Sequence, residues 1–208
     1  MAISTYAELQ TSVANWLDRT DLTDKIPDFI ALAEARHRRD FKIRRMETRV
    51  TANTVDGTEY YSLPDDFIAM RNLQLNTDPK TALDYLTPEQ VDRVRGGSSK
   101  GKPKVFSTIG NSFQLRPIPD GVYEIEMLYY KTFTPLSDSN TTNDMLTHHP
   151  DLYLYGALVE AEPYLQNDKR IQVWSGFYDR AKQDLITSNE RDRHSGTTPV
   201  TRIDYGAY

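Results

Sequence analysis

Cysteine is absent from the 208 residues, which excludes disulfide bonds, zinc sites built on thiolates and a cysteine nucleophile. Long apolar runs are missing too, since no stretch approaches the roughly 20 apolar residues that a membrane-spanning helix needs. The first residues, MAISTYAELQ, lack the basic segment and apolar run that mark a secretory signal. We therefore expect a protein that is assembled in a reducing cytoplasm and has no membrane partner.

The charge that is present is unevenly distributed. The net charge of −5 argues against a protein that coats nucleic acid with its whole surface. Residues 1–50 hold nine Lys or Arg against eight Asp or Glu, whereas the rest of the chain holds 16 against 22. Hydrophobic residues make up 38% of the chain, as in ordinary globular domains. The length suits one domain, or one domain with an insertion.

Hydrophobic periodicity predicts helices at both ends of the chain and strands between them. Apolar residues recur at helical spacing from Tyr6 to Leu17, from Ile26 to His37, over residues 151–162 and over residues 168–188. The predicted class is α+β, mainly a helical bundle with an inserted antiparallel β subdomain and an extended C-terminal tail. The expected boundaries are 1–49 and 136–189 for the bundle, 50–135 for the β subdomain and 190–208 for the tail.

Local signals support these elements. Thr5 and Glu8 have the spacing of a capping box, and Thr87 precedes a proline that can open a short helix. Two hairpins are predicted, one joining Thr48–Asn53 to Thr58–Leu63 through Asp56-Gly57, the other joining Lys104–Ile109 to Phe113–Arg116. In a last strand, alternate residues share one face: Tyr123, Ile125, Met127 and Tyr129.

The segment from Arg36 to Arg49 is the most basic part of the chain, with seven of its 25 Lys and Arg residues. If the second helix continued through it, part of one helical face would be cationic. The residues on that face, which we take as candidates for intersubunit or channel contacts, are Arg36, Arg39, Lys42 and Arg45.

Three interpretations of this cationic face stay open. It could bind phosphate or an acidic partner. It could be a solvated face, paired with Glu34, Asp40 and Glu47 on neighbouring turns. It could also pair with acidic residues of the next subunit in a ring. We favour the last two, because no aromatic side chains alternate with the arginines to stack on bases.

No motif predicts a catalytic, cofactor or metal site. His148 and His149 are adjacent, so they cannot both face one side of a helix, and a metal site would need a distant third ligand. The loop Arg93–Lys104 contains glycine and lysine but does not match a phosphate-binding loop. Pairs of carboxylates such as Glu160 with Glu162, or Glu34 with Asp40, have little weight in a chain with 30 acidic residues.

Residues 190–208 have no periodicity and are mostly polar. Such a segment is either a disordered end or a segment that becomes ordered on a partner. The apolar residues that it retains favour docking, by strand addition or by insertion of side chains into grooves. They are Val200, Ile203, Tyr205 and Tyr208.

The order of these features resembles the head-to-tail adaptor, or connector, proteins of tailed bacteriophages. The resemblance is most specific in Asp21–Glu34, in Met46–Val50 and in Tyr60–Phe67, whose sequence is YYSLPDDF. It implies a structural virion protein at the head–tail junction, with no enzymatic activity. Twelve copies would form a ring that binds the portal protein and surrounds the channel through which DNA passes without sequence-specific binding.

The resemblance also assigns parts of the chain to partners. Val200, Ile203, Tyr205 and Tyr208 would bind the portal, and residues 50–135 would face tail proteins such as a nozzle, fibre or tube. The alternative function is a nucleic-acid-binding module that uses Arg36–Arg49. A cell-wall hydrolase is the least favoured alternative.

Overall fold

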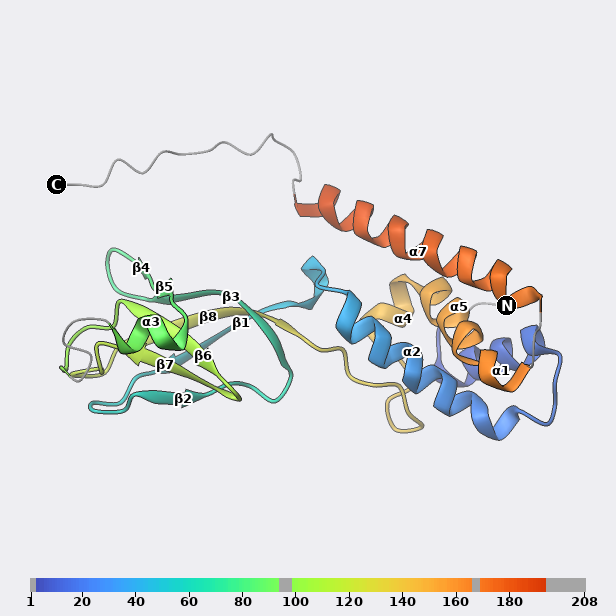
Figure 1. Ribbon diagram of the computed structural model, residues 1–208, viewed down its shortest axis with the longest axis horizontal. Helices are drawn as coiled ribbons and strands as arrows, with labels where there is room; N and C mark the ends of the chain where they lie inside the picture. The colour runs from blue at the N-terminus through green and yellow to red at the C-terminus, as the bar shows by residue number, and fades with distance from the viewer. Residues whose placement is uncertain (1–2, 94–98, 166–168, 194–208) are drawn as a thin grey trace. The chain divides into compact units, whose positions relative to one another are not determined.

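The computed structural model describes residues 3–93, 99–165 and 169–193 (Figure 1). The chain forms two compact units, one made of Met1–Arg45 with Phe133–Tyr208, the other of Met46–Thr132. The described part of the first unit is helical and that of the second contains the strands, so the α+β class is confirmed. We call them the helical unit and the β unit. The units divide after Arg45 and after Thr132, whereas the boundaries expected from the sequence were 49 and 135.

The helical unit is centred on α5 (Pro150–Glu160), which packs against three other helices. These are α1 (Tyr6–Leu17), α2 (Ile26–Asp40) and α7 (Arg170–Arg193). Gly156 permits a close approach between α5 and α2, because a Cβ atom there would lie 3.2 Å from the Cβ of Ala33. The shorter elements are η1 (Thr23–Lys25), α4 (Asp144–His148), α6 (Glu162–Leu165) and η2 (Arg44–Met46), where one unit meets the other in sequence.

The ends of the first two helices follow from local chemistry. The hydroxyl of Thr5 accepts the Glu8 N–H at 3.3 Å, while the Glu8 carboxylate accepts the Thr5 N–H at 3.0 Å, which confirms the capping box. Helix α2 has proline in its first turn and ends before Phe41, whose backbone is extended. Lys42 therefore lies beyond the helix, contrary to a cationic face that continues past residue 40.

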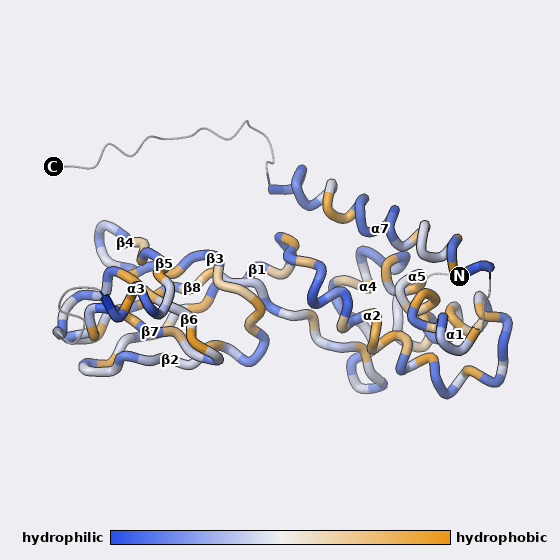
Figure 2. The backbone as a smooth tube through the Cα atoms, in the orientation of Figure 1, coloured by the Kyte–Doolittle hydropathy of each residue, from blue (hydrophilic) through white to orange (hydrophobic). Residues whose placement is uncertain are grey.

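Helix α7 buries one side over most of its length. Trp174, Tyr178, Ala181 and Leu185 are buried at the spacing predicted for this seam. In Figure 2 the tube along α7 is mostly hydrophilic and is interrupted by apolar stretches. The helix continues to Arg193, so residues 190–193, which were expected to begin an extended tail, are helical instead.

The β unit consists of two four-stranded sheets with a shared core. The strand orders are β1-β8-β3-β4 and β2-β7-β6-β5. Both sheets contribute buried side chains to one apolar cluster, for example Leu73 and Met127 from the first and Phe106 and Leu115 from the second. The strands are β1 (Glu47–Asn53), β2 (Tyr60–Ser62), β3 (Phe67–Leu75), β4 (Thr81–Ala82), β5 (Asp84–Tyr85), β6 (Val105–Ile109), β7 (Ser112–Arg116) and β8 (Glu124–Lys131), with the short helix α3 (Pro88–Asp92).

The first predicted hairpin is wrong. Strand β1 pairs with β8 and β2 pairs with β7, so the two strands around Asp56-Gly57 belong to different sheets. The turn is present, with a φ of 77° at Gly57, but the N–H of Gly57 donates to the Pro119 carbonyl at 2.9 Å. Distant strands therefore satisfied the backbone groups that the hairpin would have paired. One strand pair, β5 with β6, is parallel, which corrects the prediction of a wholly antiparallel subdomain.

The second hairpin, β6 with β7, is confirmed, with a positive φ at Gly110 in its turn. The alternation in β8 is confirmed as well. Ile125, Met127 and Tyr129 point into the apolar core. Glu126 lies on the other face, where its carboxylate accepts a hydrogen bond from the Gln74 side chain at 2.9 Å.

Candidate interaction site

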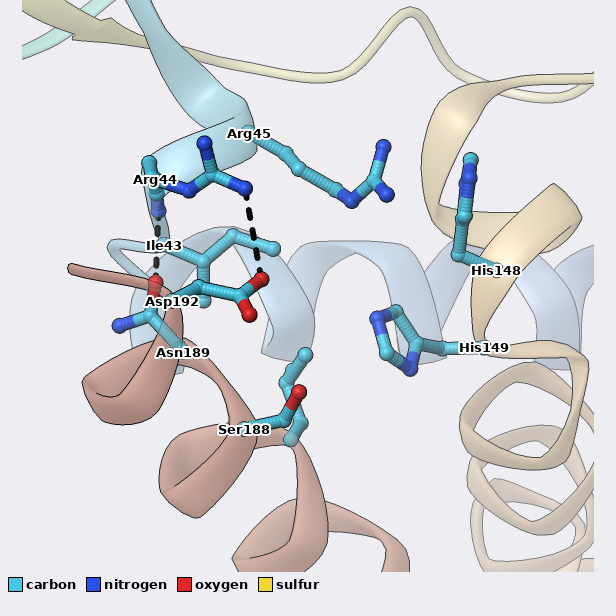
Figure 3. Close-up of a pocket in the computed structure, with 9 residues that line it drawn as sticks. Ile43, Arg44, Arg45, His148, His149, Ser188, Asn189 and Asp192 are labelled. Carbon is cyan, nitrogen blue, oxygen red and sulfur yellow. Dashed lines mark hydrogen bonds and ion pairs between the residues drawn. The ribbon is translucent and has the colours of Figure 1, made fainter. Parts of the chain in front are cut away.

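A polar cavity of about 160 Å³ lies in the helical unit near the end of α7 (Figure 3). Three segments line it: the turn around η2, the junction of α4 with α5, and the last turns of α7. The side chains come together only in the folded chain, because up to about 150 residues separate them in sequence. They are Ile43, Arg44, Arg45, His148, His149, Leu185, Ser188, Asn189 and Asp192.

The cavity wall is fixed by contacts between η2 and its neighbours. The backbone N–H of Arg44 donates to the side-chain oxygen of Asn189 at 2.7 Å, and the Arg44 guanidinium lies 3.4 Å from Asp192. Arg45 forms a similar ion pair with Asp144, also at 3.4 Å. All four charged groups are substantially exposed, so each ion pair contributes at most about 1 kcal/mol to stability. The Arg44 contacts join η2 to the C-terminal end of α7, and the Arg45 pair joins η2 to α4.

The two adjacent histidines mark the entry into α5. His149 lies between α4 and α5, and burial is the main cause that lowers the pKa of its imidazole. The ring of His148 lies 3.3 Å from the carboxylate of Asp144, four residues earlier. Over residues 3–93, 99–165 and 169–193, no group of three or more His, Asp or Glu side chains is arranged to hold a metal ion.

The basic residues predicted from the sequence do not form one face. Arg36 pairs with Glu160 of α5, and its guanidinium lies 5.6 Å from the centre of the Tyr178 ring. Arg39 is exposed on α2. The backbone carbonyl of Lys42 accepts a hydrogen bond from Arg193 at 3.3 Å. Arg36 and Arg39 lie on α2, Lys42 lies beyond that helix and Arg45 lies in η2, so the four candidates do not share one helical face.

The three acids that could pair with these cations on neighbouring turns also have partners on other elements. Glu34 accepts hydrogen bonds from the Leu136 N–H and the Tyr153 hydroxyl, both at 2.9 Å. Asp40 pairs with Lys182 at 2.6 Å, and Glu47 pairs with Arg71. The tertiary fold thus brings partners from distant parts of the chain to the acids and to the cations of this segment. Four of the seven cations in the basic segment pair with acids from other elements: Arg36, Arg44, Arg45 and Arg49.

The Glu34 carboxylate belongs to a buried hydrogen-bond network. Burial raises the pKa of Glu34 above its usual value, and burial also raises the pKa of the Tyr153 hydroxyl. The Tyr153 hydroxyl in turn accepts a hydrogen bond from Asn143 at 2.7 Å. The network joins α2, α5 and the segment that returns from the β unit. Glu34 and Asp40, which the sequence offered as a pair of carboxylates, therefore contact different partners, Tyr153 and Lys182.

Sequence analysis missed an aromatic cluster that is partly exposed on the helical unit. The ring of Tyr155 on α5 lies 5.7 Å from that of Trp16 and 5.2 Å from that of Phe177. Trp16 is 40% exposed and Phe177 38%, and Val173, one turn before Phe177, is 53% exposed. We call these four residues the aromatic patch. Helical spacing alone could not reveal it, because the rings come from three helices.

The four residues predicted to bind the portal, Val200, Ile203, Tyr205 and Tyr208, lie outside the described residues. Their role stays a prediction. The cavity at the end of α7 is the described site nearest to them in the chain, since α7 ends at Arg193.

Comparison with protein families identifies the kind of molecule that carries these features. The family described as SU10 adaptor protein matches residues 4–202, which span the described parts of both units. The chain belongs to the SU10 adaptor protein family. The resemblance to phage head-to-tail adaptors is therefore confirmed. No curated protein matches the adaptor sequence.

The family assignment gives the adaptor its general role as a phage protein. It agrees with the expectation of a structural protein, since the family is one of adaptors. Among the described residues of the adaptor, none of the helices has the length and apolar character to cross a membrane.

Proposed function

We propose that this adaptor is a structural virion component whose copies form a ring between the portal protein and the tail. The observation that carries the proposal is the family match, which covers residues 4–202 and so includes the helical unit, the β unit and most of the C-terminal segment. The ring has twelve copies in this proposal, and DNA passes through its channel without sequence-specific binding. The protein is assembled in the host cytoplasm, and its location is the head–tail junction.

In the proposed complex, the segment after α7 binds the portal through Val200, Ile203, Tyr205 and Tyr208. Two hydrogen bonds support this arrangement, because they attach the end of α7 to the turn before β1. Asn189 accepts the Arg44 N–H at 2.7 Å, and Arg193 donates to the Lys42 carbonyl at 3.3 Å. A fixed helix end gives a following segment a defined starting point, which lowers the entropy lost on docking.

The β unit contacts tail proteins in this proposal, whether nozzle, fibre or tube. Its two sheets form an apolar core of their own, so its outer surface is free for recognition without loss of stability. The candidate cations Arg36, Arg39, Lys42 and Arg45 serve contacts between subunits or near the channel. Because Arg36 and Arg45 already pair with acids of their own chain, Arg39 and Lys42 are the stronger candidates for a contact across subunits.

Electron microscopy of the protein mixed with the portal ring of its virus tests this function. Four proteins are compared: the full chain, a chain ending at Arg193, a variant with alanine at Val200, Ile203, Tyr205 and Tyr208, and a control with Thr197→Ala and Thr198→Ala. We expect a collar on the portal with the full chain and the control only. A collar with the chain ending at Arg193 would contradict the docking role, and no collar with any version would contradict the adaptor–portal complex.

A nucleic-acid-binding module receives less support, because four of the seven cations between Arg36 and Arg49 pair with carboxylates of the same chain. A titration with duplex DNA at several salt concentrations tests it. A high association constant for DNA would favour the module over the ring if its logarithm falls steeply with the logarithm of the salt concentration.

A further inference from the structure

The β unit has one long strand at a sheet edge. Within the described residues, β8 is the only strand that pairs with β1, and all seven residues of β1 pair with it in one unbroken register. The other edge strands are shorter, since β2 has three residues and β4 and β5 have two each. Short edge strands and bulges hinder the addition of a further strand, and β1 has neither feature. Its open side is therefore a template for one more strand.

An apolar groove of about 190 Å³ lies beside this open side, between β1 and β2. The two strands follow each other in the chain but belong to different sheets. Val50 and Ala52 line the groove from β1, and Tyr61 lines it from β2. The remaining lining residues are Ser62, Pro64, Phe113, Ile125 and Met127. Because side chains alternate along a strand, a strand added to β1 would place every second side chain over the groove.

The edge and the groove together specify what can bind. A strand edge presents N–H and C=O groups at regular intervals, and the extended backbone of another segment pairs with them. The groove accepts apolar side chains on one face of that segment, while its other face stays in water. The occupant is therefore an extended segment of about the length of β1 with apolar residues at alternate positions.

Residues 200–205, VTRIDY, have this pattern. They lie beyond Arg193, outside the described residues, and strand addition is one of the two docking modes expected for this part of the chain. Valine, threonine, isoleucine and tyrosine are all enriched in strands, whereas Pro199 and Gly206 on either side belong to types that strands avoid. The six residues between the proline and the glycine are close in number to the seven of β1.

One antiparallel register places the apolar side of this segment over the groove. Thr201, Ile203 and Tyr205 share one face of an extended segment. If Ile203 lies opposite Val50, then Thr201 lies opposite Ala52, which is exposed and small. The branched side chains of Ile203 and Val50 then pack as a cross-strand pair.

The same register brings opposite charges together on the outer face. Asp204 then lies opposite Arg49, whose side chain is 62% exposed and lies 3.3 Å from Glu126 of the neighbouring strand. A shift by two residues toward the start of β1 would instead place Asp204 opposite Glu47, a residue of like charge. Opposite charges across a strand pair stabilise it and like charges destabilise it. The charges thus select the register that fills the groove.

The antiparallel direction favours a second copy as the source of the segment. Every strand pair in the sheet that contains β1 is antiparallel, and this pairing is slightly more stable than the parallel one. Arg193 donates to the carbonyl of Lys42 at 3.3 Å, and Lys42 precedes the first residue of β1 by five positions. The chain's own segment therefore starts close in sequence to the beginning of β1 and would run parallel to it.

We propose that, while no portal is bound, residues 200–205 of one copy add an antiparallel strand to β1 of a second copy. Thr201 and Ile203 cover the groove, and Asp204 meets Arg49. In the proposed function the same segment binds the portal, so the two contacts exclude each other, and this exclusion rests on that function. The strand contact keeps the apolar side chains of the segment and of the groove out of water until a portal takes the segment.

The absence of cysteine from the chain permits a direct test by disulfide formation. Residues opposite each other in a strand pair have Cβ atoms about 4.5–5.5 Å apart, close to the separation in a disulfide. Ala52→Cys and Thr201→Cys, distinguished by a mass label, are mixed as full chains and mildly oxidised, and mass spectrometry identifies the joined peptides. Thr51→Cys with Arg202→Cys is the matched pair on the outer face. Thr51→Cys with Thr201→Cys is the control, because its thiols lie on opposite faces.

We expect a mixed disulfide from both matched pairs and at least several-fold less from the control pair. Equal yields from all three mixtures, or no mixed disulfide from the matched pairs, would overturn the proposal. A chain that carries both Ala52→Cys and Thr201→Cys should form its disulfide between differently labelled chains. A disulfide found only within single chains would show that the segment binds its own copy, and would also overturn the proposal.

Sedimentation of the free protein provides a readout without cysteines. Ala52→Glu places a charge in the groove, and Thr51→Glu places the same charge on the outer face, where both positions are exposed. We expect a higher average mass for the full chain and for Thr51→Glu than for Ala52→Glu and for the chain ending at Arg193. Equal masses for all four proteins would contradict the strand contact.

Addition of the portal ring separates this contact from the proposed function. The yield of the Ala52→Cys with Thr201→Cys disulfide should fall several-fold when the ring is present and a collar forms. A collar with an unchanged yield would overturn the exclusion between the two contacts. The disulfide without any collar would support the strand contact and contradict only the portal complex.

Discussion

The helical unit and the β unit differ in how the chain builds them. The β unit comes from one continuous segment, Met46–Thr132, whereas the helical unit combines Met1–Arg45 with Phe133 and the residues after it. The helical unit therefore needs residues from both sides of the β unit in sequence to be complete. Its contacts between early and late segments include the ion pairs of Arg36 with Glu160 and of Lys182 with Asp40.

The two units also treat buried ionisable groups differently. In the β unit, Glu126 is buried but surrounded by partners: Gln74 at 2.9 Å, Arg49 at 3.3 Å and Lys80 at 3.6 Å. In the helical unit, His37 is buried among the rings of Phe41, Tyr153 and Tyr178. A charge is tolerated where partners solvate it and excluded where aromatic rings surround it. The helical unit should thus be the one that responds to acid.

The largest effect should come from removing a core side chain in either unit. Leu73 of β3 and Leu158 of α5 are both fully buried. Leu73→Ala and Leu158→Ala should each lower the free energy of unfolding of their own unit by about 2–5 kcal/mol. Hydrogen exchange followed by mass spectrometry measures the stability of each unit separately. Backbone amides should lose protection against exchange first in the unit from which the leucine was removed. Equal loss of protection in both units would show that they unfold together and would remove the distinction between them.

Acid should destabilise the helical unit selectively. Burial is the main cause that lowers the pKa of His37 to about 4, so between pH 6.5 and 4 the unfolded chain binds a proton that the folded chain does not. Stability is therefore lost as the pH falls through this range, by at most about 1.4 kcal/mol per pH unit. Residues 46–132 contain no histidine. The measurement is unfolding by denaturant from pH 7 to pH 4, followed separately in each unit.

His37→Phe is the matched control for this titration. It keeps a ring among the aromatic neighbours and removes the titrating nitrogen, so the slope between pH 6.5 and 4 should become smaller. The raised pKa of Glu34 acts in the opposite direction, since it adds stability that is lost as the pH rises, and it remains in the variant. An unchanged slope in His37→Phe would mean that another group causes the acid response.

The smallest effect concerns two glycines of the helical unit. A side chain at Gly156 would meet Ala33, His37 and Tyr178, whereas one at Gly176 would meet nothing within 4 Å. Gly156→Leu should lower the free energy of unfolding by about 1–3 kcal/mol through overpacking. Gly176→Ala should raise it by up to about 1 kcal/mol, because alanine favours the helix. Thermal unfolding measures both, and a stable Gly156→Leu protein would contradict the close packing of α5 on α2.

Patterns within a few residues predicted local structure well. The capping box at Thr5, the β6–β7 hairpin, the alternation in β8 and the buried seam of α7 all depend on neighbours in sequence. The hairpin at Asp56-Gly57 failed because its strands pair with β8 and β7, which come more than 50 residues later. A turn signal specifies a change of direction, but the partners of the two strands depend on the rest of the sheet.

The candidate site shows the same limit. The basic segment was visible in the sequence, but its ion pairs were not, because Glu160, Asp144 and Asp192 belong to distant elements. The aromatic patch was not visible either, since its rings come from α1, α5 and α7.

By itself, the sequence determined the α+β class, most helix and strand positions and the adaptor family, because these depend on periodicity, capping and the order of short motifs. Only the tertiary structure decided which strands share a sheet, which acids neutralise the cations and which apolar side chains remain exposed. The physical reason is that hydrogen bonds, ion pairs and burial are satisfied by whichever groups the fold brings within reach, wherever they lie in the chain.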